Sequence, residues 1–116
     1  MVLRNVKTKE DFVQLTDHNL NQGWATLIRC HTNDKAIEKE KEMVVCLPAI
    51  SSANGRWNFK LYIVDVGKNS EKCKIIVRAS EGDKIFGSDE VVISTNGQGI
   101  WLMITDIHDW RGGQIM

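Results

Sequence analysis

Apolar and polar residues alternate along most of the chain from Trp24 onward, and short clusters of Gly, Asn, Asp and Ser interrupt the alternation. The runs with this pattern are 24–31, 56–66 and 72–79, and short, mostly apolar runs at 43–48, 91–93 and 100–106 lie between the same kinds of turn. Alternation with a period of two, broken by turn residues about every 8 to 12 positions, is typical of strands in a sandwich or barrel. The pattern predicts an all-β domain over 24–116, a small antiparallel β-sandwich or barrel of jelly-roll type.

The first 23 residues have a different pattern. In the stretch TKEDFVQL, Asp11 follows Thr8 at the spacing of a capping box, and Phe12 and Leu15 are three positions apart. These features predict a short helix or an ordered N-terminal arm over 1–23. With 116 residues in total, the chain has the length of one domain with one core.

Two strand runs predict which side chains face the core, namely Cys73, Ile75, Val77 and Ala79 in one and Ile100, Leu102 and Ile104 in the other. In the run 56–66, Trp57, Phe59, Leu61 and Ile63 share one face, and Tyr62, Val64 and Val66 share the other. Pro48 cannot donate to a β-ladder and predicts the end of its strand. The segment GKNSE, 67–71, predicts a hairpin between two of these strands.

The runs 56–66 and 100–106 carry large apolar residues on both faces. A small sandwich buries only one face of each strand, so the apolar residues on the other face would be exposed to water unless a partner surface covers them. We expect symmetric self-association to cover them. The predicted interface consists of Trp57, Tyr62, Val64, Trp101 and Met103. Two alternatives are that Trp57 or Trp101 lies beneath a loop, and that the aromatic residues form a platform for sugars.

Charge and composition exclude several function classes. Fifteen basic residues balance fifteen acidic ones, which is not the footprint of a nucleic-acid or anionic-membrane binder. The sequence has no apolar run of about 18 to 20 residues for membrane insertion and no signal-peptide core at its start, so we expect a soluble protein made in the cytoplasm. Cys30, Cys46 and Cys73 are far apart and form no CxxC pair, which predicts reduced structural cysteines.

No motif indicates catalysis, a metal or a cofactor. The glycines have neither the dinucleotide nor the P-loop spacing, and Asn54-Gly55 and Asn96-Gly97 are typical of tight turns with positive φ. The serines and histidines form no recognisable nucleophile motif, so surface or capping roles are expected for the histidines. Asp83, Asp89 and Glu90 are compatible with a carboxylate cluster for a glycosidase or Ca²⁺, but a solvated turn is the preferred interpretation.

The order of landmarks over 44–110 resembles the small trimeric β-domains of bacteriophage fibres and virion-surface proteins. That family has several landmarks in a fixed order. They are a strand that ends in Leu-Pro, a glycine turn, a Gly-Asn or Asn-Gly turn, a Gly-Asp-x-Ile-x-Gly turn and a Gly-x-x-x-Leu strand near a Trp. Here these places are held by Leu47-Pro48-Ala49, Gly55, Gly67 with Asn69, Gly82-Asp83 with Ile85 and Gly87-Ser88, and Gly99 with Leu102 and Trp110. Lys84 and Phe86 depart from the family, which usually has Thr and a small polar residue there.

The resemblance implies a non-enzymatic virion structural protein that forms a homotrimer, with no cofactor. It looks like a capsid decoration or head-fibre protein on the virion surface, synthesised in the host cytoplasm. The N-terminal arm would then contact the major capsid protein or other virion proteins through Leu3, Val6, Phe12 and Leu15. One alternative is a tail-fibre tip that recognises host surface glycans, and another is a glycan-binding or glycan-active protein unrelated to phage.

Overall fold

The computed structural model describes residues 3–8, 12–15, 25–32, 42–50, 60–106 and 108–115. The described residues form ten strands and no helix. The strands are β1 Leu3–Thr8, β2 Phe12–Gln14, β3 Ala25–Cys30, β4 Met43–Cys46, β5 Lys60–Asp65, β6 Ile75–Arg78, β7 Lys84–Ile85, β8 Glu90–Ile93, β9 Gly99–Asp106 and β10 Asp109–Ile115. No helix long and apolar enough to span a membrane occurs in the described ranges. The all-β prediction is confirmed.

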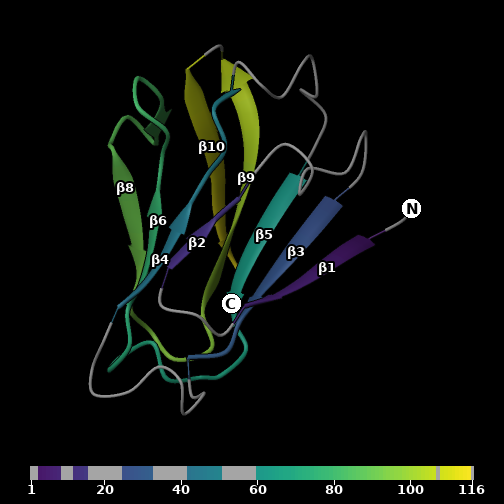
Figure 1. Ribbon diagram of the computed structural model, residues 1–116, viewed down its shortest axis with the longest axis vertical. Helices are drawn as coiled ribbons and strands as arrows, with labels where there is room; N and C mark the ends of the chain where they lie inside the picture. The colour runs from purple at the N-terminus through teal and green to yellow at the C-terminus, as the bar shows by residue number, and fades with distance from the viewer. Residues whose placement is uncertain are drawn as a thin grey trace.

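The strands form two sheets that lie face to face as layers (Figure 1). The six-stranded sheet has the order β1-β3-β5-β9-β10-β7, and the four-stranded sheet has the order β2-β4-β6-β8. From β1 to β6 the chain passes to the other sheet after every strand, so β1, β3 and β5 run parallel, as do β2, β4 and β6. These six strands are therefore connected like three stacked coils of a β-solenoid.

The direction of the chain reverses after β6. β8 is antiparallel to β6, β9 to β5, and β10 to β9, while the short β7 is parallel to β10. The predicted antiparallel connectivity of a jelly roll is thus wrong for five of the eight strand pairings in the described residues. The hairpin predicted at 67–71 is also wrong, because this segment crosses from β5 in one sheet to β6 in the other.

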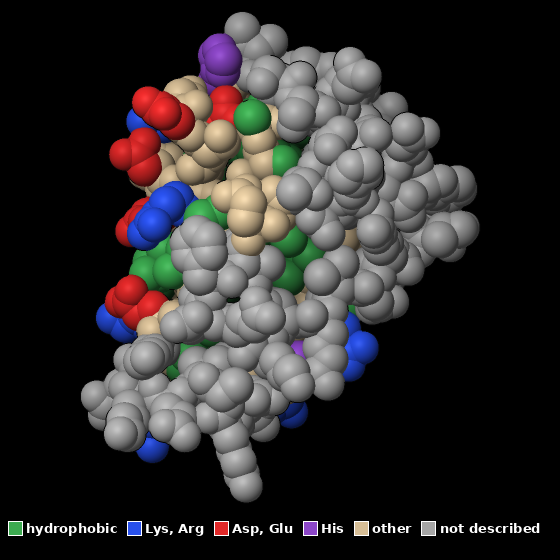
Figure 2. All heavy atoms as spheres, viewed as in Figure 1, with side chains coloured by type: hydrophobic (Ala, Val, Ile, Leu, Met, Phe, Trp, Pro, Cys, Tyr) green, Lys and Arg blue, Asp and Glu red, His purple; other side chains and the backbone are tan. Residues whose placement is uncertain are grey.

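The hydrophobic core lies between the two sheets and follows the predicted alternation. Leu61 and Ile63 of β5 are fully buried, and so are Ile75 and Val77 of β6. The core cluster also contains Leu15, Ile28, Cys30, Met43, Val45, Leu47, Ile50, Cys73, Ile85, Ile93, Ile100, Leu102, Ile104 and Trp110. Lys, Arg, Asp and Glu side chains gather instead along the edge formed by β8, as Figure 2 shows. The inward faces predicted for the described strands are confirmed.

The described N-terminal residues are strands of the two sheets, and the short helix expected around 8–15 is wrong. β1 pairs with β3 at the edge of the six-stranded sheet, and β2 pairs with β4 at the edge of the four-stranded sheet. Leu15, just after β2, is buried in the core and donates its N–H to the carbonyl of Cys46. The weak local preference for a helix is overridden by strand pairing and by burial of Leu15 in the core. Tertiary contacts commonly override a weak helix propensity.

Strand β10 was not predicted, because its centre is the glycine pair Gly112-Gly113 and glycine has low β-propensity. Its pairing with β9 explains these glycines. A Cβ at Gly112 would lie 1.8 Å from the carbonyl oxygen of Trp101, so no other residue fits at this close approach. Three other glycines, Gly82, Gly87 and Gly97, have positive φ in turns, as the sequence predicted for Gly97.

Candidate functional site

The outer face of the six-stranded sheet carries an aromatic row, which consists of Leu27 of β3, Tyr62 of β5 and Trp101 of β9. Leu27 is opposite Tyr62 in the register, and Tyr62 is opposite Trp101. Their neighbours along each strand, such as Leu61 and Leu102, point into the core, so the three side chains of the row point outward. All three are half-buried by their neighbours on this face.

Two further apolar residues lie beside the aromatic row. Val64 is opposite Gly99, and Met103 is opposite Lys60, so both belong to the same outer face as Tyr62 and Trp101. The structure therefore brings together four of the five residues of the predicted interface. The fifth, Trp57, lies outside the described residues.

The indole of Trp101 lies over the backbone of β10. Gly113 is directly opposite Trp101, and a Cβ at Gly113 would be 2.9 Å from the indole Nε1. Lys60 reaches the same ring, with its Nζ 5.5 Å from the ring centroid, at cation–π distance. Sequence reasoning missed both residues, because their contacts with Trp101 come from strand pairings that no local pattern encodes.

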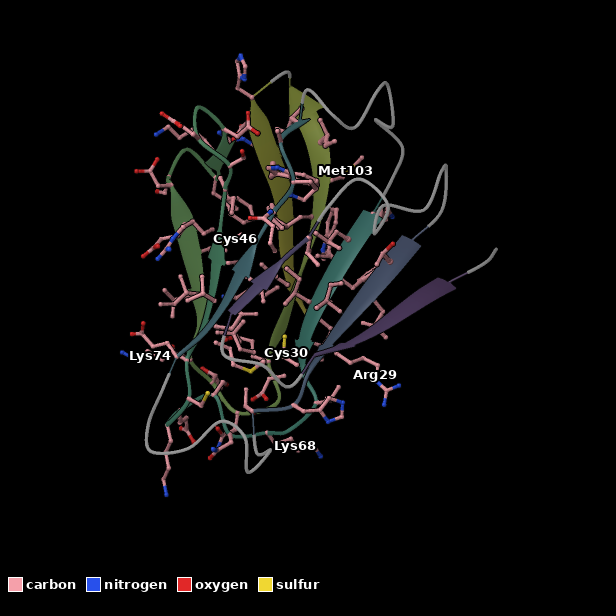
Figure 3. All side chains as sticks on the ribbon, in the orientation of Figure 1. Arg29, Cys30, Cys46, Lys68, Lys74 and Met103 are labelled. Carbon is pink, nitrogen blue, oxygen red and sulfur yellow. The ribbon has the colours of Figure 1, made fainter. Side chains whose placement is uncertain are left out.

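Basic residues surround the aromatic row. Arg29 is beside Val64 in the register, and Figure 3 shows its side chain extending away from β3. Arg111 is opposite Met103 on β10, and its Nε lies 2.6 Å from the Oδ2 of Asp109. The face thus has an apolar centre with the cations Arg29, Lys60 and Arg111 at its periphery. The apolar centre offers contact area to a partner, and the peripheral cations are placed where they can stay near water or meet a carboxylate.

A buried carboxylate organises the loops at the end of β5. Asp65 accepts hydrogen bonds from the Thr32 hydroxyl at 2.5 Å and from the backbone N–H groups of Ser70 and Gly97, both at 3.0 Å. Burial alone would raise the pKa of Asp65, but the hydrogen bonds from Thr32, Gly97 and Ser70 lower it below its usual value. Asp65 therefore joins three loops in its ionised form, which is a structural role.

The cysteines near this carboxylate are unreactive thiols. All three cysteines are free, and Cys30 and Cys73 are buried. Burial raises the pKa of Cys30 to about 12, and the nearby Asp65 and Cys73 contribute to this rise. Burial and Asp65 also raise the pKa of Cys73. Since the thiolate is the nucleophile and the metal ligand, both residues behave as the predicted structural cysteines.

The three acidic residues considered as a carboxylate cluster each have a separate partner. Lys84 Nζ is 2.5 Å from Asp89 Oδ1, and Arg78 Nε is 3.3 Å from Glu90 Oε2. Asp83 is buried, so the solvated turn preferred for it from the sequence is wrong. The described residues contain no group of three or more His, Cys, Asp or Glu that could hold a metal ion.

Asp83 and His108 form the pair that most resembles a catalytic arrangement. The carboxylate accepts the N–H of Ile50 at 2.9 Å and lies 3.1 Å from Nδ1 of His108, whose imidazole is largely exposed. The carbonyl of His108 in turn accepts the N–H of Lys84. These contacts tie three connecting segments together, and His18, the other histidine beside an acid in the sequence, lies outside the described residues.

The residues predicted to contact a capsid are divided between the sheet edges and the core. Leu3 and Val6 belong to β1, and Phe12 belongs to β2, the edge strands of their sheets. Leu15 is fully buried in the core, so it stabilises the fold and offers no surface to a partner. No protein-family model matches the chain, and a search of curated proteins finds no match.

Proposed function

We propose that this protein is a non-enzymatic structural protein of the bacteriophage virion surface, a trimeric capsid decoration or head-fibre protein. The observation that carries the proposal is the outer face built from Tyr62, Val64, Trp101 and Met103, which a monomer leaves partly in water. The family resemblance of 44–110 supports the virion surface as its location. The host cytoplasm is then the place of synthesis.

Self-association through this face has a clear physical basis. Each half-buried aromatic side chain retains on the order of 50 Å² of accessible area, and its removal from water stabilises the complex by about 1–2 kcal/mol. In a three-fold assembly the contacts are head-to-tail, so each subunit meets one neighbour with one part of this face and the other neighbour with another part. The peripheral cations Arg29, Lys60 and Arg111 remain near water, where their charges cost little. The apolar centre supplies the affinity between subunits. The cations exclude relative orientations of the subunits that would bring like charges together.

The edge strands β1 and β2 are the proposed contact with the major capsid protein or other virion proteins. An edge strand presents backbone N–H and C=O groups that an incoming strand can pair with. Leu3, Val6 and Phe12 belong to these strands. Because Leu15 is in the core, the contact is tested better by Asn5→Pro, which removes one N–H of β1, than by deletion of the segment. Unchanged capsid binding by a folded Asn5→Pro variant would contradict this contact.

Light scattering coupled to size-exclusion chromatography tests the trimer. We expect a mass that is a multiple of three subunits for the wild type and a smaller assembly for the double variant Tyr62→Ser, Trp101→Ser. Phe86→Ser serves as the matched control, since Phe86 is an exposed aromatic residue in a turn outside this face. A wild-type protein that stays monomeric at all concentrations would refute the proposal.

Glycan binding by a tail-fibre tip is the second candidate. It is favoured by the indole of Trp101, which lies over Gly113 with the ammonium group of Lys60 nearby. Aromatic faces of this kind stack on sugars, and the cation suits sugars that carry a carboxylate. A glycan array with the wild type, Trp101→Ser and Lys60→Gln decides this candidate. Glycan retention that is lost in both variants would favour it over association through the same face.

A further inference from the structure

The outer face of the four-stranded sheet carries a second apolar row, which consists of Val44, Ile76 and Val92. In the register Val44 is opposite Ile76, and Ile76 is opposite Val92. Their neighbours Val45, Val77 and Ile93 are fully buried toward the core, so this row faces outward. Val92 is 44% exposed, the most accessible of the three exposed large hydrophobic residues among the described residues. Ile76 is 7% exposed but does not belong to the core cluster.

An ion pair lies beside this row on the same two strands. Arg78 and Glu90 are directly opposite each other, and their side chains are 47% and 43% exposed. The contact joins Nε of the guanidinium to Oε2 of the carboxylate at 3.3 Å. The guanidinium has further N–H donors at its Nη atoms, and the carboxylate has a second oxygen, so each group has the capacity for another partner. Figure 2 shows hydrophobic side chains beside acidic and basic ones along this edge.

We propose that two copies of the chain pack face to face through these two strands around a two-fold axis. The β6–β8 face, defined as Ile76, Arg78, Glu90 and Val92, is complementary to itself in this geometry. If the axis runs parallel to the strands and between β6 and β8, the rotation places Ile76 against the partner's Val92. The same rotation places Arg78 against the partner's Glu90.

Charge complementarity selects a second copy as the occupant of the β6–β8 face. A two-fold contact must be self-complementary, because each residue of one subunit meets the symmetry-related position of the other. Val92 supplies most of the exposed apolar surface at the centre, beside the largely buried Ile76, while Arg78 and Glu90 supply two identical charge pairs across the axis. An axis across the strands would instead bring Arg78 of β6 against Lys74, the cation just before β6. The charges therefore determine one orientation of the two copies.

This contact uses a different face from the proposed trimer and is independent of it. Both interfaces together give six subunits when the two-fold axis is perpendicular to the three-fold axis. The two-fold contact alone gives a dimer, and the three-fold contact alone gives a trimer. The mass of the assembly therefore separates failure of this inference from failure of the proposed function.

Charge-reversal variants test the two-fold contact. We expect Arg78→Glu alone and Glu90→Arg alone to halve the mass measured by light scattering, because each places like charges opposite each other twice. An equimolar mixture of the two variants restores both charge pairs across the axis, so we expect the wild-type mass to return. The mixture does not restore the pair within either chain, so its effect reports the contact between subunits.

Lys84→Glu and Asp89→Lys are the matched controls, since this exposed ion pair lies outside the β6–β8 face. We expect them to leave the mass unchanged. Val92→Ser gives a second test that alters no charge, and we expect it to reduce the two-fold association. Single charge variants that keep the wild-type mass would overturn the proposal, as would folded single variants whose mixture remains dissociated. Circular dichroism and thermal unfolding establish that each variant is folded.

Discussion

Removal of the Asp65 carboxylate is predicted to destabilise the whole fold. In Asp65→Ala, the N–H groups of Ser70 and Gly97 lose their acceptor, and the hydroxyl of Thr32 loses the group to which it donates. A buried donor without an acceptor costs about 1–3 kcal/mol, which applies to the buried Ser70 N–H, and the partly buried Gly97 N–H adds a smaller cost. A domain of this size is stable by about 5–15 kcal/mol, so the expected loss is a large part of the total.

Urea unfolding followed by tryptophan fluorescence measures this loss. We expect a lower midpoint with an unchanged slope, since the same surface becomes exposed on unfolding. Asp89→Ala is the matched control, because Asp89 is an exposed carboxylate that pairs with Lys84, and its midpoint should stay near that of the wild type. If the two variants lose the same amount of stability, the structural role assigned to Asp65 is refuted.

The same carboxylate predicts a dependence of stability on pH. The pKa of Asp65 is lower in the folded protein than the ordinary value of 3.8, so the folded state favours the ionised form. Its contribution is complete above the pKa of the unfolded chain and is lost as the pH falls through the lower pKa of the folded state. The difference in unfolding free energy between the wild type and Asp65→Asn should therefore narrow at acidic pH. A difference that stays constant from neutral pH to pH 2 would contradict this explanation.

Three other substitutions give further predictions. Gly113→Val places a side chain where the Trp101 indole lies, so we expect a shifted fluorescence maximum and a loss of about 1–2 kcal/mol in urea unfolding. Nε1 of the buried Trp110 has no hydrogen-bond partner in the described structure, so Trp110→Phe should cost only the lost packing, about 1–2 kcal/mol, and a larger loss would show that the indole N–H is needed. Phe86 has a φ of 52°, a left-handed conformation that strains an aromatic residue and that Asn adopts more readily. Phe86→Asn should therefore raise the midpoint of thermal unfolding, and a lower midpoint would show that Phe86 is not strained.

The sequence predicted the strands that alternate strongly, but not how they pair. β5 and β6 follow their patterns because Leu61, Ile63, Ile75 and Val77 must all reach one core. Alternation gives the face of each side chain and carries no information on the direction of the neighbouring strand. The parallel stacking of β1, β3 and β5 and the glycine-rich β10 therefore lay beyond a local pattern.

For the outer face of the six-stranded sheet, the sequence predicted the apolar residues but not the cations around them. The alternation placed Tyr62 and Trp101 away from the core, and pairing of β5 with β9 then put them side by side. Lys60 and Gly113 both contact the Trp101 indole, but they belong to the neighbouring strands β5 and β10, so no pattern local to β9 could predict them. The burial of Asp83 was missed for the same reason, since its partners Ile50 and His108 are distant in the sequence.

The passage of the chain between the sheets has a consequence for the order of folding. Of the described strands, β9 and β10 are the consecutive pair that share a sheet, so theirs is the hairpin that can form locally. Every other neighbouring pair is separated in the sequence by at least one strand of the opposite sheet, and the entropy of closing such loops slows folding. The β9–β10 pair needs only a short turn, whereas β1, β3 and β5 can pair only after the chain has passed through the opposite sheet between them. We therefore expect the glycine-rich β10, the strand with the weakest local pattern, to be part of the earliest structure.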